Sequence, residues 1–188
     1  PVLRTDHGTY AIRYAGMNEL RQVEQWLAMN KAQTFEDWRD ALRMQAFASF
    51  NFVYADREGN TMFVHNSLTP NRVAGYDWTQ YLPGDDSSLI WGSYMPFDEL
   101  PQVINPKSGY IHSANQSPFR VTAESDNPIK ANYRIEDGFP TRMTNRADRG
   151  LELFAELGPI SEQEFSDIKH DKSFSKNSRS MAFLNKLM

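Results

Sequence analysis

Two apolar segments that flank a short polar turn constrain the fold of this chain more than any other feature. Residues 49–55 (SFNFVYA) and 61–66 (TMFVHN) are rich in aromatic and β-branched side chains. Between them lies DREGN, a turn that contains Gly59. Runs of this composition on either side of a glycine-containing turn are typical of antiparallel strands. The sequence therefore predicts a β-hairpin over residues 49–66.

Two polar side chains interrupt this hairpin. Asn51 stands within an otherwise apolar strand, and a buried carboxamide needs hydrogen-bond partners. It is either a structural bridge or part of the lining of a pocket, and the residue pattern leaves both open. His65 has no second His, Asp or Glu at metal-ligand spacing, so we interpret it as a strand-end histidine.

Two helices are predicted before this hairpin. The first covers residues 18–30, with Asn18 as its N-cap. The second begins after Thr34, and Asp37 three residues further on resembles a capping box. The apolar stripes are Leu20, Val23, Trp26 and Leu27 in the first helix, and Phe35, Trp38, Leu42 and Ala46 in the second. Both helices are interpreted as packing elements, because aromatic stripes at helical spacing are far more often core than ligand site.

Other local patterns complete the secondary-structure prediction. Residues 1–14 alternate around His7-Gly8 and predict a second hairpin. Residues 146–157 predict a helix despite Gly150, and residues 161–169 predict another after a serine–glutamate capping box. The apolar side of the earlier helix consists of Leu151, Phe154 and Leu157. Residues 172–188 are expected to be a weakly ordered end.

Long loops separate these elements. Residues 68–97 hold several Pro and Gly residues and five scattered Trp and Tyr rings without a clear period. A long aromatic-rich loop of this kind is usually functional or disordered, and so many large rings favour a loop laid over a surface. Residues 120–144 are also irregular.

A short polar stretch within residues 105–119 (NPKSGYIHSANQSPF) carries the candidate chemistry. Residues 110–113 alternate like a short strand, and two adjacent carboxamides, Asn115 and Gln116, follow it before Pro118. A side-chain amide fixed at a strand end can donate a hydrogen bond to a developing oxyanion. The alternative is that both amides only cap a turn through local backbone bonds.

Composition excludes several classes of protein. The chain has 188 residues, of which 40% are hydrophobic and 13% aromatic, which is typical of a globular protein. Its net charge of −4, with both signs interspersed, argues against a nucleic-acid partner. The absence of cysteine excludes disulfides, thiolate metal sites and a cysteine nucleophile. No apolar run approaches the roughly 20 residues that span a membrane.

The common catalytic signatures are missing from the sequence. It contains no dinucleotide-binding glycine pattern, phosphate-binding loop, zinc-protease motif, nucleophile elbow or EF-hand. What remains is a set of amides, arginines and aromatic loops without an evident nucleophile. The residues by themselves predict a binding domain or an incomplete enzyme.

Four blocks, in this order and spacing, resemble the β-subunit of penicillin acylases. They are NFVYADREGNTMFVHN at 51–66, GYDWTQYLPG at 75–84, WGSYMPFDELPQVINPKSGYIHSANQSPF at 91–119 and RADRGLEL at 146–153. The resemblance covers residues 1–171. It implies an α+β chain that is part of the four-layer αββα fold of N-terminal-nucleophile hydrolases, a family that also includes acyl-homoserine-lactone acylases.

The resemblance also implies an amide hydrolase and the roles of two residues. In such enzymes a precursor cuts itself, and the serine freed at the new N-terminus attacks an amide, with its own α-amino group as general base. Asn115 matches the asparagine that holds the oxyanion, although the family has a second asparagine where this chain has Gln116. Arg146 matches an arginine that orients the catalytic centre, and Arg149, one helical turn on, is a rival for that role.

Four further residues fall on positions with known roles in the family. Phe50 matches a residue of the acyl pocket, with Asn51 beside it. Asp126 and the backbone carbonyl of Trp78 match two ligands of a structural calcium ion that many members bind. Calcium takes about 6–8 oxygen ligands, so the others would lie outside this chain. No cofactor is expected for catalysis.

The start of the chain departs from the family pattern. Pro1 corresponds to a point inside the β-subunit and has no hydroxyl or thiol, so we expect a piece of a longer protein that is inactive alone. The expected partners are the α-subunit, the N-terminal segment of the β-subunit and a small acylated amide. By resemblance alone, the location is the periplasm or outside the cell. Two alternatives remain, a non-catalytic ligand-binding module on the same fold and an excised structural fragment.

Overall fold

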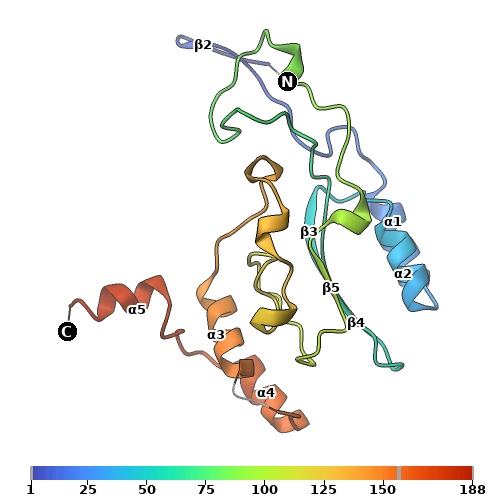
Figure 1. Ribbon diagram of the computed structural model, residues 1–188, viewed down its shortest axis with the longest axis vertical. Helices are drawn as coiled ribbons and strands as arrows, with labels where there is room; N and C mark the ends of the chain where they lie inside the picture. The colour runs from blue at the N-terminus through green and yellow to red at the C-terminus, as the bar shows by residue number, and fades with distance from the viewer. Residues whose placement is uncertain (1, 156–157, 188) are drawn as a thin grey trace. The chain divides into compact units, whose positions relative to one another are not determined.

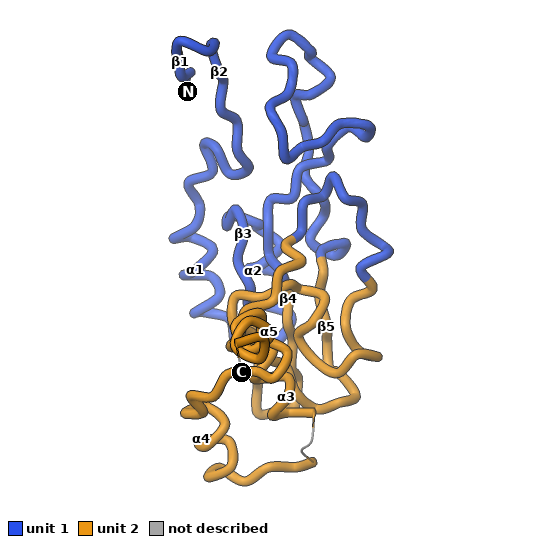
Figure 2. Tube along the Cα trace, turned by 90° about the vertical axis from the view of Figure 1, so that its left-hand side faces the viewer, with its two compact units in different colours: residues 1–52, 65–100, 130–139 blue, residues 53–64, 101–129, 140–188 orange. Residues whose placement is uncertain are grey.

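A computed structural model describes residues 2–155 and 158–187 of the chain. The chain divides into two compact units, which Figure 2 colours separately. Unit 1 comprises residues 1–52, 65–100 and 130–139, and unit 2 comprises residues 53–64, 101–129 and 140–188. The predicted division at residue 171 stays a prediction, and a short helix, α5 (Arg179–Leu184), lies beyond it.

The predicted central hairpin is confirmed as strands β3 (Ser49–Ala55) and β4 (Thr61–Ser67) (Figure 1). A third strand, β5 (Gln102–Ile104), pairs antiparallel with β4, and the strand order is β3-β4-β5. Met62, Phe63 and Val64 are consecutive and fully buried, so both faces of β4 are covered. The boundary between the units passes through β3 and β4. Strand β5 was not predicted, because three residues are too few to show the alternation of a strand.

The predicted N-terminal hairpin is also confirmed. Strand β1 (Val2–Thr5) pairs antiparallel with β2 (Gly8–Ala11), and the register joins Thr5 to Gly8. Its side chains are mostly exposed, with Leu3 54% accessible. This hairpin belongs to unit 1 and contributes little to the buried core.

Helix α1 (Gln22–Lys31) exists as predicted, but its cap and its buried face differ from the prediction. Asn18 lies outside the helix in the left-handed region, at φ 69°, and Arg21 occupies the N-cap position without a side-chain cap. The predicted face is largely exposed: Leu20 by 84%, Val23 by 80% and Leu27 by 51%. The buried residue is Gln25. Its carboxamide satisfies a buried backbone amide, which outweighs the apolar pattern at this position.

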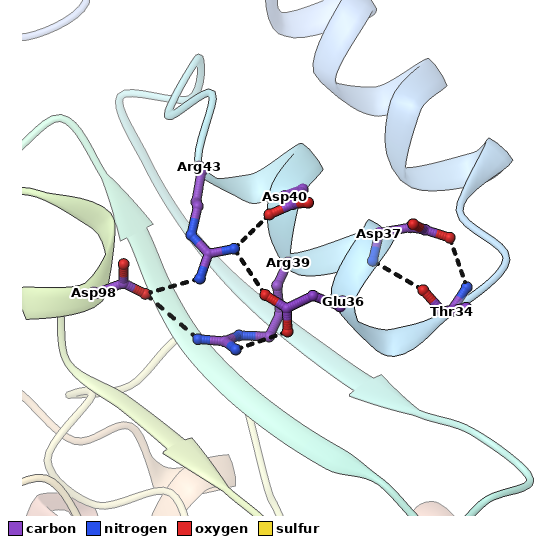
Figure 3. Close-up of polar contacts among 7 residues, drawn as sticks. All are labelled: Thr34, Glu36, Asp37, Arg39, Asp40, Arg43 and Asp98. Atoms are coloured by element: carbon purple, nitrogen blue, oxygen red, sulfur yellow. Dashed lines mark hydrogen bonds and ion pairs between the residues drawn. The ribbon is translucent and has the colours of Figure 1, made fainter.

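Helix α2 (Phe35–Leu42) begins with the predicted capping box, in which Thr34 and Asp37 bond reciprocally (Figure 3). Trp38, Leu42 and Ala46 of the predicted stripe are buried. An ion-pair cluster covers the other side of this helix (Figure 3), and it consists of Glu36, Arg39, Asp40, Arg43 and Asp98. Exposed pairs contribute at most about 1 kcal/mol each, so the apolar stripe is the main reason that α2 packs.

The aromatic-rich loop of unit 1 is ordered by stacking. Arg72 lies over the rings of Trp78 and Trp91, at 5.3 and 5.9 Å from their centroids. Arg13 lies 4.8 Å from the centroid of Trp91 and donates a hydrogen bond to the Trp91 carbonyl. The regular structure of residues 68–97 consists of a 3-10 turn at Ser87–Leu89, the start of another at Phe97–Glu99 and an isolated bridge.

Unit 2 carries the remaining helices. Helix α3 (Asn145–Ala155) confirms the prediction for 146–157, whose last two residues lie outside the described part of the chain. Helix α4 (Glu162–His170) begins with the predicted capping box between Ser161 and Glu164. Residues 120–144 form only 3-10 turns, at Glu124–Asp126, Lys130–Asn132 and Ile135–Asp137, the last two in unit 1.

The predicted strand at residues 110–113 is wrong. These residues have no regular structure. One backbone bond, from the amide of His112 to the carbonyl of Val121, replaces a strand ladder. Ile111 nevertheless packs against a buried cluster of Phe63, Val103 and Val121. The alternation therefore reflects one inward-facing side chain, which is not enough to make a strand.

Candidate functional site

Asn115 and Gln116 differ in their burial and in their hydrogen bonds. The buried Gln116 braces the turn: its Oε1 accepts from the amide of Ala114 (2.7 Å). Its Nε2 donates to the carbonyls of His112 (3.2 Å) and Arg120 (2.6 Å). Asn115 has a left-handed backbone at φ 56°, and its side chain is exposed. The capping interpretation therefore holds for Gln116, while Asn115 projects from the turn.

Arg146 contacts the carboxamide of Asn115. Its Nη2 donates to Asn115 Oδ1 at 3.2 Å. A guanidinium can only donate, so this contact fixes which end of the amide is oxygen. The Nδ2 of Asn115 then remains as a donor, and the described residues give it no hydrogen-bond partner. An exposed, oriented amide donor of this kind can serve an anionic atom of a ligand.

The start of α3 is joined to the Asn115 turn by two further contacts. Thr144 Oγ1 accepts from the amide of Ala147, as an N-cap residue does, and also donates to the carbonyl of Ala114 (both 3.2 Å). The amide of Ser117 donates to the carbonyl of Arg142 at 3.1 Å. Helix α3 is thus tied to the turn on both sides of Asn115. Thr144 was not predicted from the sequence, although a threonine before a helix is a recognisable cap signal.

Arg149, the rival of Arg146, is engaged elsewhere. It forms a two-bond ion pair with Asp171, with distances of 3.1 and 3.0 Å, and a longer contact with Glu152. Hydrogen bonding to Arg149 holds the pKa of Asp171 low, at about 2. Of the two arginines, Arg146 is the one that contacts Asn115 within the described residues.

A cavity of about 480 Å³ lies beside this arrangement in unit 2. Its walls come from residues 112–114, helices α3 and α4, and residues 171–173. Cationic side chains (Arg146, Arg149, Lys169 and Lys172) and apolar ones (Leu153, Phe154, Phe165 and Ile168) both line it. The mixture suits an amphipathic small molecule.

The two predicted pocket residues belong to unit 1. Phe50 is 51% exposed and lies beside Phe47 and Phe52, with ring centroids 5.6 and 5.4 Å away. Asn51 Oδ1 bonds His65 Nδ1 at 2.6 Å, and Ser49 Oγ lies 3.4 Å from His65 Nε2. Asn51 is therefore a structural bridge between β3 and β4. Its role beside Phe50 in a common pocket with Asn115 stays a prediction.

The described residues contain no group of three or more His, Cys, Asp or Glu side chains that could hold a metal ion. Asp126, in unit 2, accepts a bond from the amide of Ser108, and the Trp78 indole, in unit 1, donates to the carbonyl of Val73. The calcium site at these two residues stays a prediction. Among the described residues, no helix has the length and apolar character to cross a membrane.

The fold matches that of N-terminal-nucleophile hydrolases. A solved thermostable penicillin G acylase from Alcaligenes faecalis superimposes on 99% of this chain with a TM-score of 0.67, at 22% identity. The chain covers 34% of that structure. This likeness and the mixture of helices and sheet confirm the predicted α+β fold class.

Sequence comparison then defines the family. Residues 1–187 match the penicillin amidase family, and the chain belongs to it. It is 34% identical to penicillin G acylase of Escherichia coli over 129 residues, which make up 66% of this chain and 15% of that protein. It is 24% identical to acyl-homoserine lactone acylase PvdQ of Pseudomonas fluorescens (strain Pf0-1), over 86% of this chain and 23% of that protein. The chain therefore spans less than a quarter of the length of these curated relatives.

Proposed function

We propose that this chain supplies part of the oxyanion-binding apparatus of an amide hydrolase, with Asn115 as a donor and Arg146 as the residue that orients it. The hydrogen bond from Arg146 to Asn115 Oδ1 carries the proposal, because it leaves Nδ2 of an exposed amide for a ligand. Membership of the penicillin amidase family supports amide hydrolysis in general.

The proposed reaction begins at a nucleophile outside this chain. An N-terminal serine attacks the amide carbonyl, and its α-amino group takes the hydroxyl proton. Negative charge develops on the carbonyl oxygen, and Asn115 Nδ2 donates a hydrogen bond to it. The protonated α-amino group then gives this proton to the leaving nitrogen, so that the amine departs and an acyl-enzyme remains. Water hydrolyses this ester to the acid and the free serine. Arg146 holds the amide with its nitrogen toward the oxyanion and adds a positive charge nearby.

The proposed substrates are small acylated amines: β-lactams, homoserine lactones or peptide amines. The relatives are named as a penicillin G acylase and an acyl-homoserine lactone acylase. Phe50 and Asn51 are proposed to lie in the acyl pocket, which suits an apolar acyl group because Phe50 is exposed among other rings. The cavity beside Arg146 is proposed for the amine part of the substrate.

The rest of the enzyme is also a proposal. The working protein would contain an α-subunit and a nucleophile-bearing β N-terminus, made by self-cleavage of a precursor that is secreted or periplasmic. A structural calcium ion would use Asp126 and the carbonyl of Trp78 together with oxygen ligands outside this chain. The isolated chain should not hydrolyse phenylacetyl or fatty-acyl amides, and a rate above that of buffer would contradict this.

The test is Asn115→Ala in the full-length protein. Removal of one oxyanion donor lowers kcat by roughly 10²–10³, about 2.7–4 kcal/mol, while KM changes much less. Asn115→Asp keeps the shape but puts negative charge beside the oxyanion, so it should be at least as damaging. Near-normal kcat in a matured Asn115→Ala protein would mean that Asn115 is only a turn residue. A wild-type protein that binds acyl amides without hydrolysing them would favour a non-catalytic binding module.

A further inference from the structure

His112 lies in a notch of helix α3 made by the missing side chain of Gly150. A Cβ at Gly150 would collide with the Nε2 and Cε1 atoms of the His112 ring. Glycine within a helix is unfavourable by itself, and a close approach of another group is a common reason for it. Gly150 is an irregularity in the sequence of the predicted helix, and the ring of His112 accounts for it.

The ring packs against the helical turn that follows Arg146. His112 Nε2 is buried and has no hydrogen-bond partner among the described residues. Burial lowers the pKa of His112, which favours the neutral ring.

The backbone of His112 makes two hydrogen bonds to other parts of unit 2. Its amide donates to the carbonyl of the fully buried Val121 at 2.7 Å. Its carbonyl accepts from Gln116 Nε2, the amide that braces the Asn115 turn. Its ring also lies beside that of Phe154, with centroids 6.0 Å apart. His112 therefore links the buried core of unit 2, the turn and helix α3.

Arg146 lies between two attachments of α3 to the turn. Thr144 joins the start of the helix to Ala114, and His112 joins Gly150, roughly 9 Å further along the helix axis. Attachments at two points along α3 set the direction of its axis as well as the position of its start. The contact between Arg146 and Asn115 is a single exposed hydrogen bond. Such a bond adds little free energy in water, so it is too weak to set the position of a helix.

We propose that His112 is a positioning residue for the Asn115–Arg146 pair: by fitting against Gly150, with its backbone bonded to Val121 and Gln116, it fixes α3 so that the guanidinium meets Asn115 Oδ1. This inference rests on the proposed oxyanion role of Asn115. His112 is not assigned a catalytic role, because its Nε2 is buried against Gly150.

The experiment compares His112→Asn with His112→Leu in the full-length protein. Asparagine keeps a flat group that can lie against Gly150 as the ring does, whereas leucine has the same branching but two methyl groups that are not flat. We expect His112→Leu to lower kcat about 10-fold with KM nearly unchanged, and His112→Asn to restore most of kcat. Equal kcat values for both variants, whether normal or reduced, would overturn the proposal, because the shape of the group against Gly150 would then be irrelevant.

A second measurement keeps the test decisive if His112→Leu fails to fold. Gly150→Ala should displace the ring and lower kcat several-fold. The double variant His112→Asn/Gly150→Ala should lose less than the product of the two single effects, because the smaller side chain leaves room for the methyl group. Unchanged kcat in Gly150→Ala would contradict the proposal.

The Asn115→Ala background separates this inference from the proposed function. If His112 acts through Asn115, His112→Leu and Gly150→Ala should lower kcat no further in that background. Full activity of Asn115→Ala would remove the proposed function. A large loss in Asn115→Ala with no loss in His112→Leu or Gly150→Ala would remove the positioning role alone.

Discussion

Each unit of this protein contains a pair of carboxamides, and the two pairs are used differently. In unit 1, Gln25 and Asn66 are both fully buried, and every side-chain oxygen and nitrogen of the pair makes a hydrogen bond. In unit 2, Gln116 is buried and bonded at both ends, but Asn115 is exposed and bonded only through its oxygen within the described residues. The unit 1 pair bonds the backbone groups of Leu42 and Ala46. The Nδ2 donor of Asn115, in contrast, has no hydrogen-bond partner among the described residues.

The comparison gives a physical criterion for separating structural amides from functional ones. A buried amide must be satisfied, so its partners are backbone groups that would otherwise be orphaned. An amide meant for a ligand must keep one group unbonded until the ligand arrives, and a fixed partner must orient it beforehand. Substitutions in the two pairs should accordingly change different quantities.

The largest effect on stability is expected from Gln25→Leu. This change leaves the amide of Ala46 and the Oδ1 of Asn66 buried without partners. Each unsatisfied group costs about 1–3 kcal/mol, so we expect a loss of about 2–6 kcal/mol. Hydrogen exchange in α1 and β4 of the full-length protein would measure it. Protection equal to wild type would show that the unit 1 amides are not structural.

The next largest effect concerns His65, which precedes Asn66 in β4 and whose ring bonds Asn51. Burial lowers its pKa from 6.5 to about 4, so the unfolded chain binds a proton between these values that the folded chain does not. Stability is therefore full above pH 6.5 and decreases as the pH falls to about 4, by about 3 kcal/mol in all. Thermal unfolding against pH should show this slope, reduced in His65→Gln and unchanged in the control His7→Gln, at an exposed position. A slope that survives His65→Gln would assign it to other groups.

Predictions from the sequence were most accurate for structure that depends on residues close together in the chain. The central hairpin and the capping boxes at Thr34 and Ser161 follow from local patterns, and the structure has them at the predicted places. The inward-facing Gln25 was not predicted, because its partner groups lie at residues 46 and 66. The strand at 110–113 was predicted wrongly because a strand needs backbone partners from elsewhere in the chain. Of these residues, only His112 makes a backbone–backbone hydrogen bond, to Val121.

The candidate site shows the same limit. Asn115 could be singled out as an amide near a turn. Without the resemblance, however, the residues did not decide whether this amide braces the turn or donates to an oxyanion. The resemblance pointed to Arg146, and the geometry separates it from Arg149 through the contact with Asn115. The fit of His112 against Gly150 joins residues 38 positions apart and left only an unexplained glycine as its signal.

A matched pair of arginine variants sharpens the comparison within unit 2. Arg146→Met should lower kcat roughly 10–100-fold, about 1.4–2.7 kcal/mol, because Asn115 loses its orienting partner. Arg149→Met should leave kcat within a few-fold and instead weaken the attachment of α3 to Asp171. Steady-state kinetics and thermal unfolding of both full-length variants would measure the two effects. A larger loss of kcat in Arg149→Met would exchange the two assignments.

The smallest effects should come from the two threonines that cap helices, one in each unit. Thr34 caps α2 and contacts only its own capping box, whereas Thr144 caps α3 and also bonds the carbonyl of Ala114 beside Asn115. Replacement of either by alanine should cost about 1 kcal/mol of stability, the usual value of an N-cap. Only Thr144→Ala should also lower kcat, by a few-fold, because α3 loses one attachment to the turn. Thr144→Ser, which keeps the hydroxyl, should restore both. If Thr34→Ala and Thr144→Ala lower stability equally and neither changes kcat, the start of α3 does not control Asn115, and orientation of the amide must then depend on Arg146 and the Gln116 brace.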